Sequence, residues 1–289
     1  MSVSLTIKQK TNLSGFPKAA ELIEITGASQ LEAPDRAILN KLLEYAHDAG
    51  NIADPNAEWQ LPLASLRQGH KHESNDRVRQ SLRNLMKIEV AVHYKTDSGE
   101  LRELRTHLIE YVDISSGNEI GANVRFGIPK KLGVILEVSQ RWGRIKSEVT
   151  FAMSSRYAIA LYELLCLRAN LDRCIEVFST DRFRELLGVP PDTYKKGDDF
   201  RRFVIAPALL EVNGLSDLSV QIDLRRRHSR APIHEVVMAW SKKQGDEYRA
   251  SMRELNNSKL GRKARLRGNV VETTNFEEDA SNMLLDGSR

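Results

Sequence analysis

Apolar residues recur along this chain first at the spacing of helices and then at the spacing of strands, and this order occurs twice. In the first half, apolar positions three and four residues apart predict helices over residues 34–48 and 74–87, with a short helix at residues 64–67 between them. Alternating runs at residues 89–94 and 105–112 predict a hairpin after the second long helix. Two helices followed by a hairpin are the order of a winged helix-turn-helix.

The second half of the chain repeats this order. We expect a helix, a strand, two further helices and two final strands at residues 154–170, 176–178, 181–187, 194–213, 218–224 and 233–240. The sequence therefore predicts an α+β protein of two tandem winged-helix domains. No residue-level repeat accompanies the repeated order of elements.

The predicted domains occupy residues 31–148 and 149–241. Residues 1–30 show little periodicity, so we expect an N-terminal arm there. From Ser241 onward the apolar pattern decays: residues 242–268 carry nine Lys and Arg against three acids, and residues 269–289 carry five acids against one Arg. These properties predict a flexible, charged C-terminal tail over residues 242–289.

Composition adds modest constraints. The 289 residues are enough for two domains of about 120 residues each, and the net charge of +4 weakly favours a polyanionic partner. The two cysteines, Cys166 and Cys174, fit a reducing compartment better than a disulfide framework. The sequence shows neither a signal peptide nor an apolar run long enough to span a membrane, so we expect a cytoplasmic protein.

The predicted helix over residues 194–213 is the strongest candidate for reading DNA. Its N-terminal end carries Lys195, Lys196, Arg201 and Arg202, and side chains at this end of a recognition helix reach base edges in the major groove. We expect Pro207 to kink the helix. The apolar residues expected to face the core are Phe203, Ile205, Leu209, Leu210 and Val212. The alternative is an ordinary amphipathic helix with a solvated basic face.

Two further groups are weaker candidates. The tip of the second hairpin carries four arginines without an acid, and it could hold phosphates or enter a minor groove as a wing: Arg225, Arg226, Arg227 and Arg230. The second predicted helix of the first domain could read bases or support a dimer interface through Arg77, Gln80, Asn84 and Lys87. A basic cluster over residues 253–267 is either a non-specific phosphate contact or a solvated tail.

Motifs of enzymes are not evident in the sequence. His70-Lys71-His72 has the spacing of the metal-binding histidines in rolling-circle nucleases, but Lys71 stands where those enzymes have an apolar residue. Residues 127–133 lack the Gly-Lys-Ser/Thr ending of a P-loop. We therefore predict no catalytic residue, no metal and no cofactor, and a protein that is not an enzyme.

Three segments of the second half resemble the theta-type, iteron-binding plasmid replication initiators, the Rep proteins. They are the helix Ser154–Leu165 with its Leu-Tyr-Glu-Leu-Leu sequence, the helix Phe183–Val189, and the run Phe200–Asn213. The last segment is the most specific, because Pro207, Glu211 and Asn213 match the family in identity and spacing. The first half is similar only in the order of its helices and their apolar spacing.

The resemblance implies a protein with two winged-helix domains whose monomers bind repeated iterons of a plasmid origin as double-stranded DNA. The C-terminal domain would contribute most of the base reading. Bound monomers would help to open the origin and to recruit the host initiator and replicative helicase, whereas dimers would repress the protein's own promoter. The alternatives are a winged-helix transcriptional regulator without a replication role and a nicking Rep of the rolling-circle type.

Overall fold

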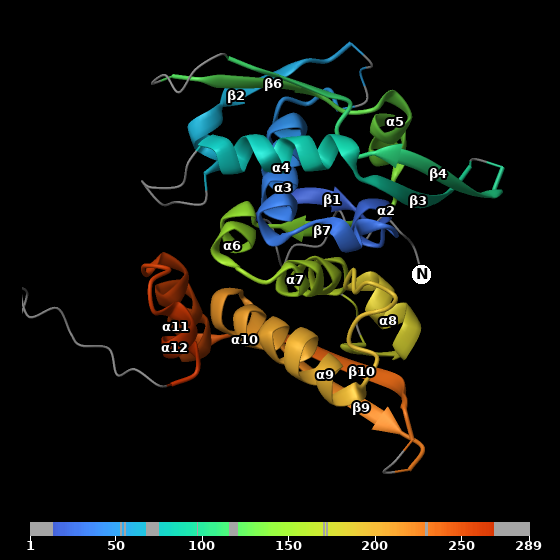
Figure 1. Cartoon of the computed structure of the whole chain (residues 1–289), viewed down its shortest axis with the longest axis vertical. Coiled ribbons are helices and arrows are strands. Elements are labelled where there is room, and N and C mark those ends of the chain that lie inside the picture. Colours follow the sequence, from blue (N-terminus) through green and yellow to red (C-terminus); the bar gives the residue numbers. More distant parts are fainter. Residues whose placement is uncertain are drawn as a thin grey trace, which may run out of the picture.

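The computed structural model describes residues 14–268, apart from residues 53, 55, 68–74, 97, 116–120, 170, 172 and 229–230. The described chain is a mixed helix and sheet protein of two winged-helix modules, one above the other in Figure 1. We call residues 16–152 the first module and residues 156–242 the second module. No helix among the described residues is long and apolar enough to cross a membrane.

The first module contains fourteen elements within the described residues. Its helices are α2 (Ala20–Ile23), η1 (Ala28–Gln30), α3 (Ala33–Asp48), η2 (Leu63–Leu66), α4 (Asn75–Lys87), α5 (Lys130–Val138) and α6 (Ser147–Ala152). Its strands are β1 (Phe16–Ala19), β2 (Trp59–Pro62), β3 (Glu89–Lys95), β4 (Leu101–His107), β5 (Tyr111–Ile114), β6 (Asn123–Gly127) and β7 (Trp142–Ile145).

Helix α3 forms where its apolar spacing predicts a helix. Glu32 and Asp35 form a capping box, in which the Glu32 amide donates to Oδ2 of Asp35 at 3.0 Å, and Pro34 lies in the first turn. The predicted apolar stripe is buried, with each side chain at most 3% exposed: Ile38, Leu39, Leu42, Leu43 and Ala46. This expectation is confirmed.

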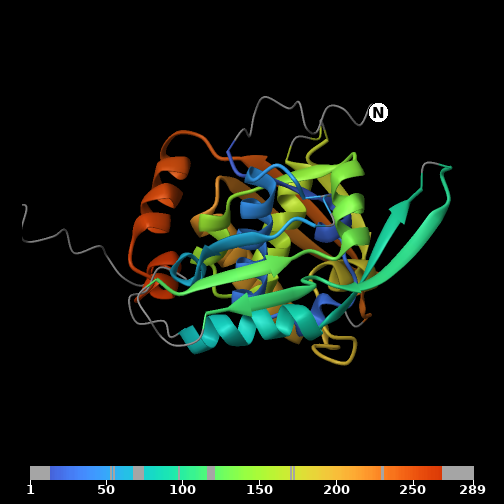
Figure 2. The same ribbon diagram turned by 90° about the horizontal axis from the view of Figure 1, so that it is seen from above.

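The predicted hairpin is correct for its first strand and wrong for the second. Strands β3 and β4 pair antiparallel as a separate ribbon, but β4 ends at His107. Leu108 and Ile109 are buried and redirect the chain into β5, which joins a different sheet in the order β2-β6-β5. Seen from above, the β3–β4 ribbon projects from one side of the body (Figure 2).

The N-terminal arm expected over residues 1–30 is wrong for residues 16–30. Strand β1 pairs antiparallel with β7, so the start of the described chain is fixed beside the segment that leads into the second module. Phe16 and Leu22 are almost fully buried. A strand and a helix of four residues each are too short to show a period in the sequence. Residues 1–13 lie outside the described residues.

The second module begins with α7 (Arg156–Arg168), which Ser155 caps by accepting a hydrogen bond from the Ala158 amide. The elements that follow are β8 (Ile175–Ser179), α8 (Thr180–Leu186), α9 (Gly197–Phe200), the π-helical η3 (Arg201–Ile205), α10 (Ala206–Leu215), β9 (Leu218–Arg226) and β10 (Ile233–Lys242). The sheet has the order β8-β10-β9. The predicted order of elements is confirmed here.

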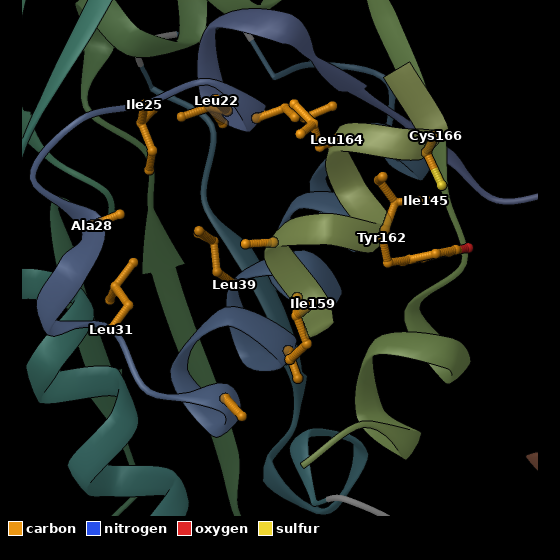
Figure 3. Close-up of a cluster of buried hydrophobic side chains, with 14 of the residues drawn as sticks. Leu22, Ile25, Ala28, Leu31, Leu39, Ile145, Ile159, Tyr162, Leu164 and Cys166 are labelled. Atoms are coloured by element: carbon orange, nitrogen blue, oxygen red, sulfur yellow. The ribbon is translucent and has the colours of Figure 1, made fainter. Parts of the chain in front are cut away.

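Helix α7 packs against the first module and is buried on all sides from Tyr157 to Arg168. Figure 3 shows Ile159, Tyr162 and Leu164 of this helix packed among side chains of the first module such as Leu39. A polar cluster is buried in the same region. Nζ of Lys18 contacts Oε1 of Glu163 at 2.8 Å, and Asn40 bonds to both. One core therefore joins the modules.

The flexible tail expected from residue 242 is wrong for residues 245–266. These residues form α11 (Gly245–Asn256) and α12 (Arg262–Leu266), which pack against α10. Arg262 is buried, and its guanidinium donates to Glu254 and to four backbone carbonyls, including Ala152 O at 3.0 Å. Much of the basic charge of the predicted tail therefore takes part in contacts within the folded protein. Residues 269–289 lie outside the described residues.

Candidate nucleic-acid interface

The second recognition helix is one continuous helix from Gly197 to Leu215 with a π turn inside it. The π turn spans Arg201–Ile205 and ends two residues before Pro207. Proline has no N–H to donate and its ring clashes with the carbonyl four residues earlier, so an irregular turn is expected here. The predicted kink thus takes the form of a π turn, a feature frequent at functional sites.

This π turn decides which side chains face outward. Arg201, Arg202 and Phe203 are exposed, whereas Val204 and Ile205 are buried. The expectation that Phe203 faces the core is therefore wrong: its side chain is 44% exposed and stacks on Tyr194 with a centroid distance of 5.4 Å. The other four apolar residues of the prediction, Ile205, Leu209, Leu210 and Val212, are buried or half-buried.

The basic residues before and on this helix differ in their surroundings. Nζ of Lys195 lies 2.9 Å from Oδ1 of Asp192, an exposed pair worth little energetically. Lys196 is exposed and directly precedes α9. Among the described residues, the Arg201 guanidinium has neither an ion pair nor a hydrogen bond, and the one contact of the Arg202 guanidinium is with the Phe203 ring. Two arginines are thus available to an external partner.

The loop before the helix is fixed by a residue that sequence reasoning missed. The Arg184 guanidinium donates to the carbonyls of Thr193 and Tyr194, the latter at 3.0 Å, and lies 5.2 Å from the Phe200 ring centroid. Tyr194 has φ of 49°, a strained conformation that these bonds help to hold. A basic residue at the end of α8 carries no sequence signal for this role.

The residues that carry the family resemblance in this helix are structural. Glu211 is buried and accepts hydrogen bonds from the amides of Ser154 and Ser155, both at 2.9 Å, and from the Ser154 hydroxyl. The Asn213 side chain bonds to both backbone groups of Val220. These contacts fix the helix on α7 and β9, and so determine which face is presented outward.

The arginines of the second wing, the tip of the β9–β10 hairpin, differ in whether they form contacts within the protein. Arg225 lies 3.3 Å from Asp223. The Arg226 guanidinium reaches Oδ1 of Asp198 at 3.3 Å, so it connects the wing to the N-terminal end of α9. Arg227 is exposed without an ion pair among the described residues, and Arg230 lies outside them. The structure therefore assigns Arg226 a contact inside the protein.

Several polar side chains of helix α4 in the first module form hydrogen bonds within the protein. Gln80 donates to Asn84 at 2.9 Å and accepts from the Arg83 guanidinium, and Asn84 donates to Asp35 of α3 at 3.2 Å. Arg77 and Lys87 are exposed at opposite ends of the helix. In Figure 1 both α4 and the α9–α10 helix lie toward the viewer, one in each module. The two helices that carry the predicted sets thus lie on the same side of the molecule in this view.

The remaining candidates contribute no site among the described residues. His70 and His72 lie outside them, and no group of three His, Cys, Asp or Glu side chains within them could hold a metal ion. Cys166 is buried, Cys174 is exposed, and they form no disulfide. In the 253–267 cluster, Arg262 and Arg265 both form ion pairs with Glu254, so part of their charge is balanced within the protein.

The two modules define a tandem winged-helix protein with its two recognition helices on one face. Residues 18–166 match the family model described as "Initiator Replication protein, WH1", and residues 179–240 match the model described as "Initiator Rep protein, WH2". The chain belongs to this family of initiator Rep proteins. The resemblance noted in the sequence is confirmed, and α7 falls within the first matched region.

Two solved structures are similar to this chain to different degrees. The crystal structure of the Pi initiator protein in complex with iteron DNA aligns with a TM-score of 0.56 and 15% identity, covering 79% of this chain and 97% of the other. The WH1 domain of a replication protein isolated from a multiple sclerosis patient aligns with a TM-score of 0.26 and 13% identity, covering 38% and 83%. No curated protein matches the sequence.

Proposed function

We propose that this chain initiates replication of a plasmid by binding iteron repeats in its origin as double-stranded DNA. The observation that carries the proposal is the pair Arg201 and Arg202, exposed on the N-terminal half of the second recognition helix without an ion pair among the described residues. Arginine recognises guanine through two hydrogen bonds in the major groove. The Pi initiator, which has a similar fold, was crystallised with iteron DNA.

The proposed contacts follow from exposure and position. Lys195, Lys196, Arg201 and Arg202 would lie in or beside the major groove. The wing residues Arg225, Arg227 and Arg230 would neutralise phosphates or enter the minor groove, with Arg226 able to join them by releasing Asp198. In the first module the proposed contacts are Arg77, Gln80, Asn84 and Lys87, of which Gln80 and Asn84 would have to exchange internal hydrogen bonds for contacts with DNA.

The remaining steps belong to the same proposal. Bound monomers would promote opening of the origin and recruit the host initiator and replicative helicase, and a dimer would repress the protein's own promoter. The protein would act in the cytoplasm and would carry out no enzymatic step itself. The family models describe initiator domains and not an enzyme, which supports this part of the proposal.

Binding selection from the source replicon tests the proposal. Sheared replicon DNA is incubated with the chain at about 150 mM salt, which suppresses much of the sequence-independent binding, and the retained fragments are sequenced. We expect tandem direct repeats beside an AT-rich segment. A single palindrome would instead indicate a transcriptional regulator, and fragments no different from random would overturn DNA-sequence recognition altogether.

A further inference from the structure

Phe203 is an exposed aromatic residue on the face proposed to enter the major groove. Its side chain is 44% exposed, whereas Phe200, three residues earlier in the same helix, is 2% exposed. Ala206, three residues later, is exposed as well. Phe203 and Ala206 thus form a small apolar surface on a helix whose other outward residues are charged. Exposed apolar surface with a polar rim is typical of a contact site.

The Phe203 ring is held in position before any partner binds. It stacks on the Tyr194 ring at a centroid distance of 5.4 Å and an interplanar angle of 27°. The Arg202 guanidinium carbon lies 5.1 Å from the same ring centroid. Tyr194 is in turn fixed by the bond from Arg184 to its carbonyl. Since a fixed side chain loses little conformational entropy on binding, this arrangement favours recognition.

The π turn explains why charge and apolar surface lie side by side. A π turn holds more residues than an α turn, so consecutive side chains are separated by a smaller rotation about the helix axis. Arg201, Arg202 and Phe203 are three consecutive residues, and all three are exposed. In a regular helix one of them would turn further toward the core. The turn therefore places Phe203 beside the two arginines on the outward face.

We propose that Phe203 recognises the 5-methyl group of one or two thymines next to a guanine bound by Arg202. The major-groove edge of thymine carries this methyl group, and apolar side chains including Ala and Phe contact it, whereas Arg binds O6 and N7 of guanine. The proposal rests on the proposed function, because it requires this helix to lie in the major groove. It adds an apolar contact that contributes to sequence specificity, whereas the arginines recognise bases through hydrogen bonds.

Deoxyuridine substitution isolates the methyl group. A duplex carrying the selected binding site is synthesised with one thymine at a time replaced by deoxyuridine, which removes one methyl group and leaves every hydrogen-bonding group in place. We expect the dissociation constant of the wild-type chain to rise roughly fourfold at one or two positions, the effect of losing one buried methyl group. Replacement at the other thymines should leave it unchanged.

Two variants assign the effect to a residue. Phe203→Ala should bind the thymine and deoxyuridine duplexes equally, because the apolar partner of the methyl group is gone. Val138→Ala, which also truncates an exposed apolar side chain but lies on α5, should keep the wild-type preference. Thermal melting of each variant establishes that it is folded. A purely structural role of Phe203 would weaken binding to both duplexes by the same factor.

The outcomes are distinct. A thymine preference in the wild type that Phe203→Ala abolishes supports the proposal. Equal wild-type affinity for all thymine and deoxyuridine duplexes overturns it and leaves the proposed function intact. A preference that persists in Phe203→Ala also overturns it, because another residue then contacts the methyl group. Failure of the wild type to bind any selected duplex contradicts the proposed function itself, and the inference falls with it.

Discussion

The two recognition helices of this protein have the same place in their modules and differ in what their polar side chains contact. On α4, Gln80 and Asn84 bond to each other and Asn84 bonds to Asp35, so these groups are already satisfied. On the second helix, Arg201 and Arg202 have no ion pair among the described residues. Breaking an internal hydrogen bond to form an external one yields little net free energy. Base reading should therefore lie mainly in the second module.

The two wings differ in the same way. In the first wing, β3–β4, Arg105 lies 2.7 Å from Glu103 and 3.3 Å from Glu89, and Arg102 lies 3.0 Å from Glu100. In the second wing, Arg225 and Arg226 also pair with acids, but Arg227 is exposed with no acid paired to it among the described residues. Charges already paired within a wing attract phosphates less. The second wing is thus the better electrostatic contact.

The largest expected effect concerns the buried cluster that holds the modules in one arrangement. Lys18→Met leaves the Glu163 carboxylate buried without its 2.8 Å partner, so the free energy of unfolding should fall by about 3–5 kcal/mol. Chemical denaturation measures this loss. The double variant Lys18→Met/Glu163→Gln should recover most of it, and a single-variant loss under about 1 kcal/mol would mean that the pair does not join the modules.

Arginine replacement in the second module tests the contrast between the helices. Arg202→Ala should weaken binding to the selected site by about 1–3 kcal/mol, because a bidentate guanine contact is lost, and should affect random DNA less. Gln80→Ala in the first module is the matched comparison and should cost under about 0.5 kcal/mol, the low end of the net value of one hydrogen bond. Fluorescence anisotropy titrations measure both. Equal losses for the two variants would remove the distinction.

The wings can be separated by salt dependence. Arg227→Ala should lower the slope of log binding constant against log salt concentration by about one, since one phosphate contact is lost. Arg105→Ala in the first wing should leave the slope almost unchanged, because its charge is balanced by Glu103 and Glu89. Titrations at several salt concentrations give both slopes. A larger change for Arg105→Ala would assign the phosphate contact to the first wing.

The last prediction concerns Lys243, whose ammonium group donates to the carbonyls of Asn213 and Ser216 at the C-terminal end of the second recognition helix. Desolvation lowers the pKa of Lys243 to about 8, more than Glu247 and Asp217 raise it. The usual pKa is 10.5, so the unfolded chain binds more protons than the folded chain between these values, and stability should rise with pH across that window. Lys243→Met should reduce this rise in denaturation curves measured from pH 8 to 10.5. An unchanged slope would show that the folded pKa is normal.

Long helices with one apolar stripe could be predicted from the sequence, because burial of that stripe determines them. Helix α3 is an example. The strands of the second wing could be predicted from their alternating apolar residues. β1 and α2 could not be predicted, since they are short and their burial depends on β7 and α7. The helices after residue 245 have polar sequences, and they are fixed by tertiary contacts such as those of Arg262.

The candidate site was only partly predictable for a related reason. The exposed positions of Arg201 and Arg202 follow from their polarity. Phe203 was assigned to the core because a regular helical period places it there, and the π turn before Pro207 changes that period. The partners of Arg226 and Asn84 lie 28 and 49 residues away in sequence, so no local pattern reveals them.

The most direct test of the central claim is a footprint of the chain on the origin of its replicon. At about 150 mM salt we expect evenly spaced direct repeats to be protected by the wild type and by Gln80→Ala. The same protection should be lost in the double variant Arg201→Ala/Arg202→Ala. Protection that survives in this double variant, or that disappears in Gln80→Ala instead, would contradict the assignment of base reading to the second module.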